Sequence, residues 1–248
     1  MSGESASEVR AAFDESRIKY LEEKARLIRL DIVQMAYEAG SERRGHPGPA
    51  LSSADIVAAL FFDIMRIDPA NPRWPDRDRF VLSKGHACPV LYAALAQKGF
   101  FPREKLKSFR RSGGMLQGHP DMKGIPGVDM TTGSLGHGLS AGLGIALAAD
   151  IDKRDYRVFV IIGDGECQEG LIWEAAMAAP KFLLGNLIAI IDRNEWQSCG
   201  KVCETMPMYP FIEKWRAFGW NTIEINGHDM RQILSAFEIA VNHKNQPT

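Results

Sequence analysis

The sequence predicts an α/β fold, a doubly wound and mostly parallel sheet with helices on both faces. Short apolar runs rich in β-branched and aromatic residues indicate strands that are buried on both faces. The stretches between them repeat apolar residues at the three- and four-residue spacing of helices, and this alternation without an internal repeat favours an open parallel sheet. We expect four strands, at residues 80–83, 158–162, 186–191 and 222–225.

The first part of the chain is expected to be helical. Apolar residues repeat with the helical period over 18–39 and again over 53–65. Ser52 or Ser53 is placed to cap the second helix. Between the two helices, Gly45-His46-Pro47-Gly48 is predicted to form a rigid loop because proline and glycine interrupt regular structure.

A second strand-to-helix corner is predicted in the middle of the chain. The apolar run at 80–83 continues directly into Lys84-Gly85-His86, and a helix follows. A basic helix is expected over 103–111. Residues 112–137 are rich in Gly and Pro without a clear element, and loops of this length tend to be functional. A helix of small residues over 138–150 then leads to the next strand.

The C-terminal part is predicted to contain two further helices. One covers about 211–217, and the other begins near Asp229, which is expected to cap it, and extends to about Val241. The last three residues, Gln246-Pro247-Thr248, indicate the approach to another strand.

The most informative stretch lies between the second and third predicted strands. Gly163-Asp164-Gly165 follows the second strand, and Asn194 follows the third. Because the carboxyl ends of parallel strands lie at one edge of a sheet, Asp164 and Asn194 can be neighbours in space. Their oxygens suit a hard divalent cation, and glycines before a helix allow a phosphate to approach the backbone. A lone Gly-Asp-Gly is more often a turn, but this combination predicts a metal-bridged diphosphate site.

Composition excludes several other classes. The 248 residues carry a net charge of −1 without a long run of one sign, so neither nucleic acid nor a membrane surface is an expected partner. We expect a flexible segment over 1–17 and one domain over 18–248. The N-terminus lacks the apolar core of a signal peptide, and no apolar run is long enough to span a bilayer. The four cysteines form no CxxC pair, which favours free thiols in a reducing cytoplasm over a metal site.

His46, His86 and His119 each lie beside a glycine in a predicted loop. A single loop histidine is more often structural or merely exposed. Three of them near one predicted diphosphate site favour a role in proton transfer or in binding sugar hydroxyl groups.

These residues together resemble the thiamine-diphosphate-binding motif, and their surroundings are similar to transketolase from about Ile18 to Thr248. The resemblance implies Mg²⁺ (or Ca²⁺) held by Asp164, Asn194 and the backbone carbonyl of Trp196. It also implies that His86 contacts the cofactor diphosphate beside Gly163 and Gly165.

The resemblance implies further roles around the cofactor. His46, in Gly-His-Pro-Gly, would transfer protons on the substrate side, and His119 would bind the hydroxyl or carbonyl oxygen of the donor sugar. The loop Thr132-Gly133-Ser134-Leu135-Gly136 would cover the thiazolium ring, with Leu135 packed on it. Glu169 would couple two active sites across a dimer interface, although an acid at a helix N-terminus explains it equally well.

The chain also departs from the family pattern. Gln197-Ser198-Cys199-Gly200 stands where the family has Gln-Ile-Asp-Gly, Arg44 stands where Ser is usual, and His137 stands where Gln is usual. Gly227-His228-Asp229 matches the family, but a helix cap at Asp229 is the preferred interpretation. None of these departures removes an implied metal ligand.

The resemblance is confined to the diphosphate-binding half of a transketolase. The half that carries the glutamate acting on the aminopyrimidine has no counterpart here, and a further family histidine would lie beyond Thr248. The resemblance therefore implies one subunit of a split enzyme, active only with a separate pyrimidine-binding subunit in an α₂β₂ assembly, with the C-terminal end of this domain missing. That enzyme would transfer a two-carbon ketol unit between sugars or sugar phosphates.

Other functions remain open at this stage. A transketolase-like carboligase of a biosynthetic pathway differs only in its substrates, and the sequence does not identify donor, acceptor or partner. The α subunit of a 2-oxoacid dehydrogenase is disfavoured by the motifs around His46 and His119. A degenerate, non-catalytic paralogue is supported only by the altered segment at Ser198-Cys199.

Overall fold

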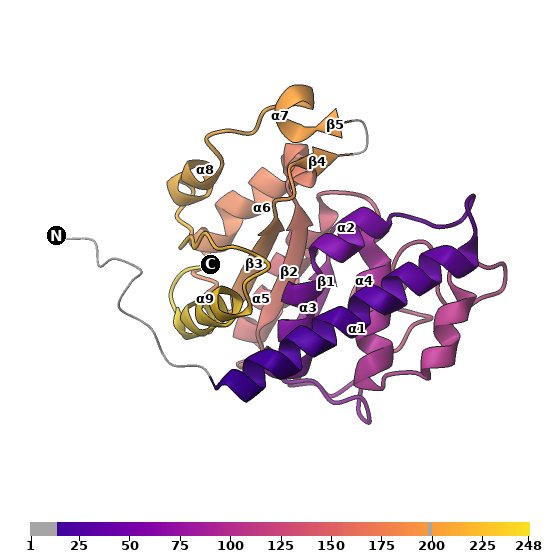
Figure 1. The fold of residues 1–248 in the computed structure, drawn as a ribbon. Coiled ribbons are helices and arrows are strands. Elements are labelled where there is room, and N and C mark those ends of the chain that lie inside the picture. Colours follow the sequence, from indigo (N-terminus) through magenta and orange to yellow (C-terminus); the bar gives the residue numbers. More distant parts are fainter. Residues whose placement is uncertain (1–13, 198–199) are drawn as a thin grey trace.

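Three parallel strands form the centre of the protein: β1 (Arg79–Leu82), β2 (Val158–Gly163) and β3 (Leu187–Asp192), in the order β1-β2-β3. The structure is a computed structural model that describes residues 14–197 and 200–248. The register pairs Phe80 with Phe159 and Phe159 with Ile188, so the three strands end at one edge of the sheet (Figure 1). The three corresponding predicted strands are confirmed within a residue or two.

Helices cover both faces of the sheet, as predicted for a doubly wound fold (Figure 1). Along β2, Phe159 and Ile161 pack on one face, against α1 (Glu15–Ala39), α3 (Ala54–Ala59), α4 (Cys88–Lys98) and α9 (Met230–Asn242). The alternate residues Val158, Val160 and Ile162 pack on the other, against α5 (His137–Ile151), α6 (Gly170–Lys181) and α8 (Phe211–Ala217). A strand buried on both faces needs apolar residues at every position, which explains the continuous apolar runs.

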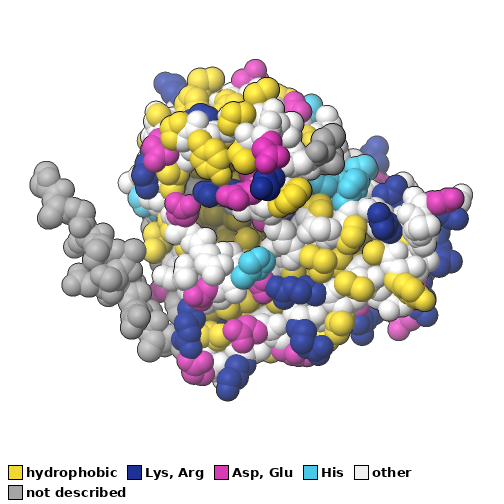
Figure 2. Space-filling model, turned by 45° about the horizontal axis from the view of Figure 1, so that its top comes forward, with side chains coloured by type: hydrophobic (Ala, Val, Ile, Leu, Met, Phe, Trp, Pro, Cys, Tyr) yellow, Lys and Arg dark blue, Asp and Glu magenta, His cyan; other side chains and the backbone are white. Residues whose placement is uncertain are grey.

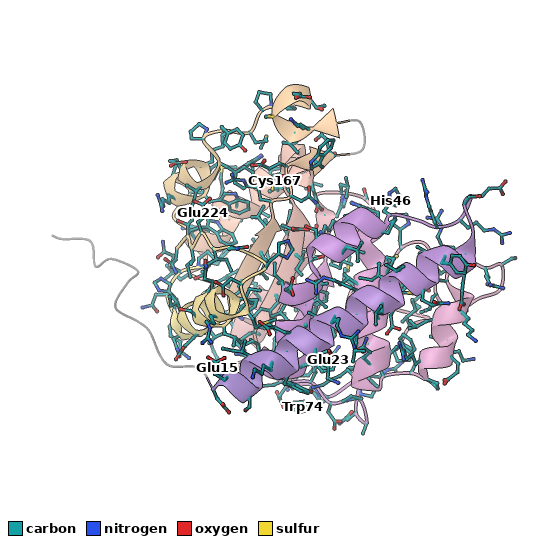
Figure 3. The ribbon with its side chains drawn as sticks, in the orientation of Figure 1. Glu15, Glu23, His46, Trp74, Cys167 and Glu224 are labelled. Carbon is teal, nitrogen blue, oxygen red and sulfur yellow. The ribbon has the colours of Figure 1, made fainter. Side chains whose placement is uncertain are left out.

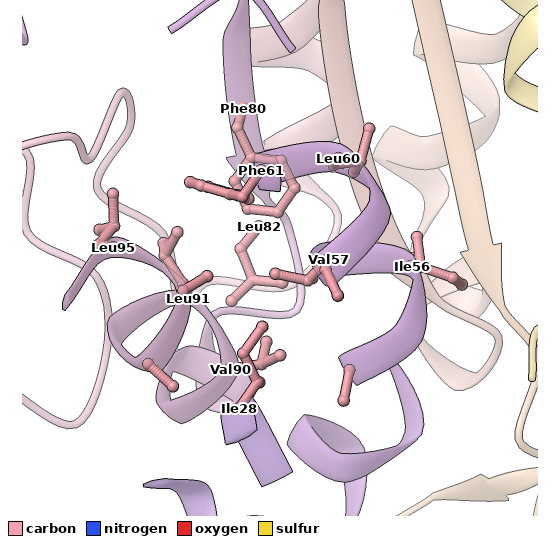
Figure 4. Packing of buried hydrophobic residues seen from close by; sticks show 14 of the residues in the cluster. Ile28, Ile56, Val57, Leu60, Phe61, Phe80, Leu82, Val90, Leu91 and Leu95 are labelled. Carbon is pink, nitrogen blue, oxygen red and sulfur yellow. The ribbon is translucent and has the colours of Figure 1, made fainter. Parts of the chain in front are cut away.

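The larger core lies beneath α1. This helix begins at the Asp14 cap and ends at Gly40, whose φ of +81° favours glycine. Its buried positions are those of the helical repeat, and Ile28 packs with Val57, Val90 and Leu91 from α3 and α4 (Figure 4). Burial of each such side chain contributes about 1.5–3 kcal/mol.

The segment after α1 differs from the expected loop. Residues Pro47–Ser52 form a short helix, α2, with proline at its first position, where the missing N–H costs no hydrogen bond. A π-helical turn, Leu60–Ile64, continues α3. Ser53, one of the two predicted caps, is the N-cap residue of α3, but its side chain makes no capping bond and its hydroxyl donates to the Pro49 carbonyl (3.1 Å). The Ser52 hydroxyl donates to Asp192 Oδ1 (2.7 Å).

Two other regions differ in part from the sequence-based expectation. The basic helix after α4 is a shorter 3₁₀ helix, Arg103–Ser108. After β3, where no element is predicted, the chain forms a small hairpin, β4 (Trp196–Gln197) with β5 (Gly200–Lys201), followed by the helix α7 (Val202–Thr205). In the described ranges, no helix combines the length and the apolarity that crossing a membrane requires.

The predicted strand at 222–225 is wrong, because these residues pair with no strand of the sheet. They form one wall of a groove of about 1080 Å³, and β3 and α9 form the others. Figure 2 shows this hollow with apolar side chains on its floor. At one end of the groove, Thr248 donates to the Leu187 carbonyl (3.2 Å) and accepts from Ala189 N–H (2.8 Å), which is the first rung of a parallel ladder on the free edge of β3.

Candidate active site

The site lies where the three strands end. β1 leads through Ser83 and Lys84 into a 3₁₀ turn, Gly85–Ala87, and β2 leads through Asp164 into another, Gly165–Gln168. β3 ends at Asp192, which pairs in register with Gly163. In Figure 3, His46 at the start of α2 and Cys167 after β2 lie at this end of the molecule, whereas Trp74 lies at the opposite end.

The structure brings Asp164 next to the segment that follows β3. Its Oδ2 accepts the Glu195 N–H at 2.7 Å, and its Oδ1 accepts the Gly165 N–H at 2.9 Å. The Asn194 side-chain oxygen accepts the Trp196 N–H at 2.9 Å. Burial raises the pKa of Asp164, and the two backbone hydrogen bonds oppose that rise. Because each of these oxygens keeps a second lone pair, they remain available to a hard cation.

The donor set fits a cation that is shared with a phosphate. Within residues 14–197 and 200–248, no group of three or more His, Cys, Asp or Glu side chains is arranged to hold a metal. A cation at Asp164 would therefore need the Asn194 amide, a backbone carbonyl and oxygens from a ligand. Mg²⁺ is usually held in this way, by one or two protein carboxylates together with substrate phosphate and water.

The three predicted histidines gather on the same side. The rings of His46 and His86 meet edge to face with their centroids 5.2 Å apart. Burial lowers the pKa of His86 to about 4, with smaller contributions from the charges of His46, Lys84 and His119. Burial also lowers the pKa of His119, and Arg110 and His46 add to this effect. His86 is therefore neutral near pH 7 and offers one N–H donor and one acceptor.

The glycine-rich loop at 131–136 packs closely over this region. The Thr132 hydroxyl donates to the Leu82 carbonyl at the end of β1 (2.7 Å). A Cβ on Gly85 would lie 2.7 Å from Gly133 N, so only glycine allows the loop to approach the β1 turn this closely. Gly133 has a φ of +145°, and a Cβ there would lie 2.9 Å from the His119 ring. The loop and His119 are thus held against each other.

Leu135 and Glu169 lie at the margin of the site. Leu135 is partly buried in the loop. Glu169 is exposed at the N-cap of α6 without a side-chain capping bond, and a Cβ on Gly136 would lie 2.8 Å from Glu169 Cβ. His137 is exposed at the first position of α5, with Nδ1 3.4 Å from the Leu135 carbonyl oxygen.

The remaining sequence-based predictions have mixed outcomes. Asp229 caps α9 by accepting from the N–H groups of Arg231 and Gln232, as predicted. His228 pairs with Asp55 at 2.8 Å. The Ser198-Cys199 departure lies outside the described residues.

Two buried charged groups beneath the site were not singled out from the sequence. The Lys84 ammonium bonds to Asp192 and donates to the Pro49 carbonyl (2.8 Å). The Glu166 carboxylate accepts from Ser83 and from two backbone N–H groups. A charged residue next to a predicted strand end was the only sequence signal for either group, because most of their partners lie far away in the chain.

Comparison with known proteins identifies the family. The model of the transketolase thiamine-diphosphate-binding domain matches residues 18–248. The chain belongs to the transketolase family. The chain is 51% identical over 211 residues to the 6-deoxy-6-sulfo-D-fructose transketolase subunit of a Clostridium species, covering 85% of this chain and 77% of that protein. It is 43% identical over 230 residues to an apulose-4-phosphate transketolase subunit of Phocaeicola vulgatus, covering 93% and 80% of the two chains.

Solved transketolases share this fold. The transketolase of Campylobacter jejuni superposes with a TM-score of 0.84 at 32% identity, covering 92% of this chain. The match covers only 37% of that chain, so the present chain spans about a third of a full-length transketolase. This confirms the predicted α/β, thiamine-diphosphate-binding fold and the resemblance to transketolase. The chain corresponds to one part of the larger enzyme.

Proposed function

We propose that this chain is the diphosphate-binding subunit of a two-chain transketolase, which transfers a two-carbon ketol unit between sugars. The observation that carries the proposal is the convergence, at one sheet edge, of the Asp164 turn and the His46–His86 pair. The family match and the two relatives named as transketolase subunits support it.

Thiamine diphosphate fits the residues at this edge. We assign the metal, Mg²⁺ (or Ca²⁺), to Asp164, Asn194 and the Trp196 carbonyl, because they offer hard oxygen ligands to a cation that the diphosphate also binds. We assign Gly163 and Gly165 to the cofactor site because they flank Asp164; their N–H groups bind the Glu166 and Asp164 carboxylates and so fix the turn that the diphosphate would approach. Neutral His86 would donate one N–H to the diphosphate. When bound, the cofactor supplies the carbanion that cleaves and forms the carbon–carbon bond.

The remaining polar side chains act on the sugar. We assign proton transfer at the substrate oxygen to His46, whose ring contacts His86. His119, held against Gly133, would donate to a hydroxyl or carbonyl oxygen of the donor sugar. Gly133 and Leu135 would cover the thiazolium ring and exclude water from it. His86 and His119 are uncharged near pH 7, so neither repels a proton that arrives at the His46 ring.

A second subunit would complete the site. We propose a separate pyrimidine-binding chain in an α₂β₂ assembly, with the exposed Glu169 at the interface between active sites, and no activity from this chain alone. The three described cysteines are free thiols, which suits an enzyme of the reducing cytoplasm. The relatives are named for sugars that bear a sulfo or a phosphate group, and we propose an anionic sugar as substrate here too.

The domain itself is proposed to continue. We infer that residues 18–248 belong to the diphosphate domain and that a strand following Thr248 fills the groove beside β3. The two ladder bonds of Thr248 and the free edge of β3 support this continuation. The predicted boundary after residue 17 is too late, because α1 already begins at Glu15, and the earlier part of the predicted segment lies outside the described residues.

The test of the proposed function is metal-dependent cofactor binding. Binding of thiamine diphosphate with Mg²⁺ would be measured for the assembled complex and for Asp164→Ala. We expect affinity to fall roughly a hundredfold, at the upper end of the losses seen when groups that support a bound metal are removed. Asp152→Ala, on the exposed turn after α5, is the matched control and should bind normally. Unchanged binding by Asp164→Ala would contradict the assignment.

A further inference from the structure

The buried carboxylate of Glu166 lies beneath the loops of the site and has no part in the proposed chemistry. Glu166 belongs to the 3₁₀ turn Gly165–Gln168, two residues after Asp164, and its side chain faces the protein interior. Only 3% of the residue is exposed to solvent. A buried carboxylate is costly unless donors surround it, so its partners indicate what it stabilises.

Three donors from three segments of the chain bind this carboxylate. Oε1 accepts the Ser83 hydroxyl and the Gly136 N–H (2.9 Å), and Oε2 accepts the Gly163 N–H (3.0 Å). Ser83 precedes Lys84-Gly85-His86, Gly136 ends the loop at 131–136, and Gly163 begins the Asp164 turn. One side chain therefore connects the histidine turn, the glycine-rich loop and the metal turn.

The segments that Glu166 connects are also packed closely against one another. A Cβ on Gly138 would lie 2.3 Å from the Ser83 hydroxyl oxygen, and Gly136 has a φ of +85°. The start of α5 is thus packed directly on Ser83, and the Glu166 carboxylate satisfies the N–H that this turn leaves free. Small displacements at this point change the separation of the loops that contain Gly133 and His86.

We propose that Glu166 is a positioning residue for the cofactor, fixing the three loops at the separation that thiamine diphosphate and its metal require. This inference rests on the proposed function of the same site. Glu166 itself does not contact the reacting atoms. It acts through the backbone N–H groups and the hydroxyl that it holds.

Glutamine cannot replace it. All three partners donate, and a carboxylate presents two accepting oxygens. In glutamine one of these oxygens becomes an NH₂ group, which would face either the Gly163 N–H or the Ser83 and Gly136 donors. At least one loop then loses its bond and meets a repelling donor, while the volume of the side chain is unchanged.

The test compares cofactor binding with folding. The tagged full chain, purified from its own host with any subunit that it carries, would be titrated with thiamine diphosphate in the presence of Mg²⁺. The melting temperature would be recorded with and without both compounds. For Glu166→Gln we expect cofactor affinity to fall about 10- to 100-fold and the stabilisation produced by cofactor to shrink. Glu174→Gln makes the same change on the exposed face of α6 and should behave as wild type.

A second variant keeps the test informative if Glu166→Gln does not fold. Ser83→Ala removes one donor and leaves the carboxylate with both backbone bonds, and we expect a smaller loss of affinity, roughly three- to tenfold. The inference would be overturned if folded Glu166→Gln bound the cofactor with wild-type affinity, even at a lower melting temperature. If only Ser83→Ala folds, wild-type affinity in that variant would overturn it. If the unmodified complex binds no cofactor, both the proposed function and this inference fail.

Discussion

Replacing Lys84 with methionine should destabilise the protein more than any surface change, because it breaks a buried ion pair. Lys84 and Asp192 are 1% and 6% exposed. The ammonium bonds to Asp192 and to the Pro49 carbonyl, and Ser52 donates to the other oxygen of Asp192. The pair thus joins the end of β3 to α2, the helix that begins just after His46. Methionine fills the space of the side chain but leaves the Asp192 carboxylate buried without a counter-ion.

The magnitude follows from desolvation. Burial lowers the pKa of Lys84, and Asp192 raises it only in part, so the pair contributes little net stability while it is intact. Removing one partner of such a pair costs about 3–5 kcal/mol, since an uncompensated charge remains inside. In Lys84→Met/Asp192→Asn neither charge of the pair is left, and asparagine still accepts the Ser52 bond. The double variant should therefore recover at least about 2 kcal/mol relative to the sum of the two single changes.

Urea unfolding at pH 7 measures this coupling. The free energy of unfolding would be extrapolated for wild type, both single variants and the double variant, and Lys181→Met on the exposed end of α6 is the control. A loss below about 1 kcal/mol for Lys84→Met would refute the argument, because it would mean that water reaches the pair. Additive single effects would refute it as well.

Three further predictions concern the site and the groove. Because the pKa of His86 is about 4 in the folded protein against 6.5 when unperturbed, the unfolded chain binds more protons between these values. The free energy of unfolding should therefore fall between pH 6.5 and pH 4 by about 2 kcal/mol more in wild type than in His86→Gln, a value discounted because His86 is partly exposed. An equal loss of unfolding free energy in both proteins would contradict this. Gly133→Ala should displace the His119 ring and raise KM for the donor ketose at least about tenfold, whereas Gly144→Ala, with open space around it in α5, should leave KM unchanged. In a chain that extends past Thr248, the Ile191 amide on the free side of β3 should exchange with deuterium at least about a hundredfold more slowly than in residues 1–248, and equal rates would rule out the added strand.

Most of the fold was predictable because its signals are local. The three strands of the sheet are continuous apolar runs, and α1 repeats apolar residues at the helical period, so each segment alone indicates its structure. The segment at 222–225 shows why this fails at an edge: its Thr-Ile-Glu-Ile pattern is typical of a strand, but a strand also needs a neighbour, and the groove separates it from β3. Propensity does not encode the presence of that neighbour.

The site was predictable to the extent that motifs encode it. Gly-Asp-Gly and the Gly-His segments at His46, His86 and His119 located the residues that gather at the sheet edge. α2 was missed because Pro47 and Gly48 indicate a loop, although proline suits the first position of a helix. Glu166 and Lys84 could not be interpreted from sequence, because their partners Gly136 and Asp192 become neighbours only when the sheet forms.

The central claim, a split thiamine-diphosphate enzyme, is tested most directly by native mass spectrometry of the tagged chain purified from its own host with Mg²⁺. We predict a complex of this chain with a second polypeptide, together with a mass increment for thiamine diphosphate and a metal ion. A lone chain or a homodimer that takes up no cofactor, even when thiamine diphosphate and Mg²⁺ are added, would contradict the claim.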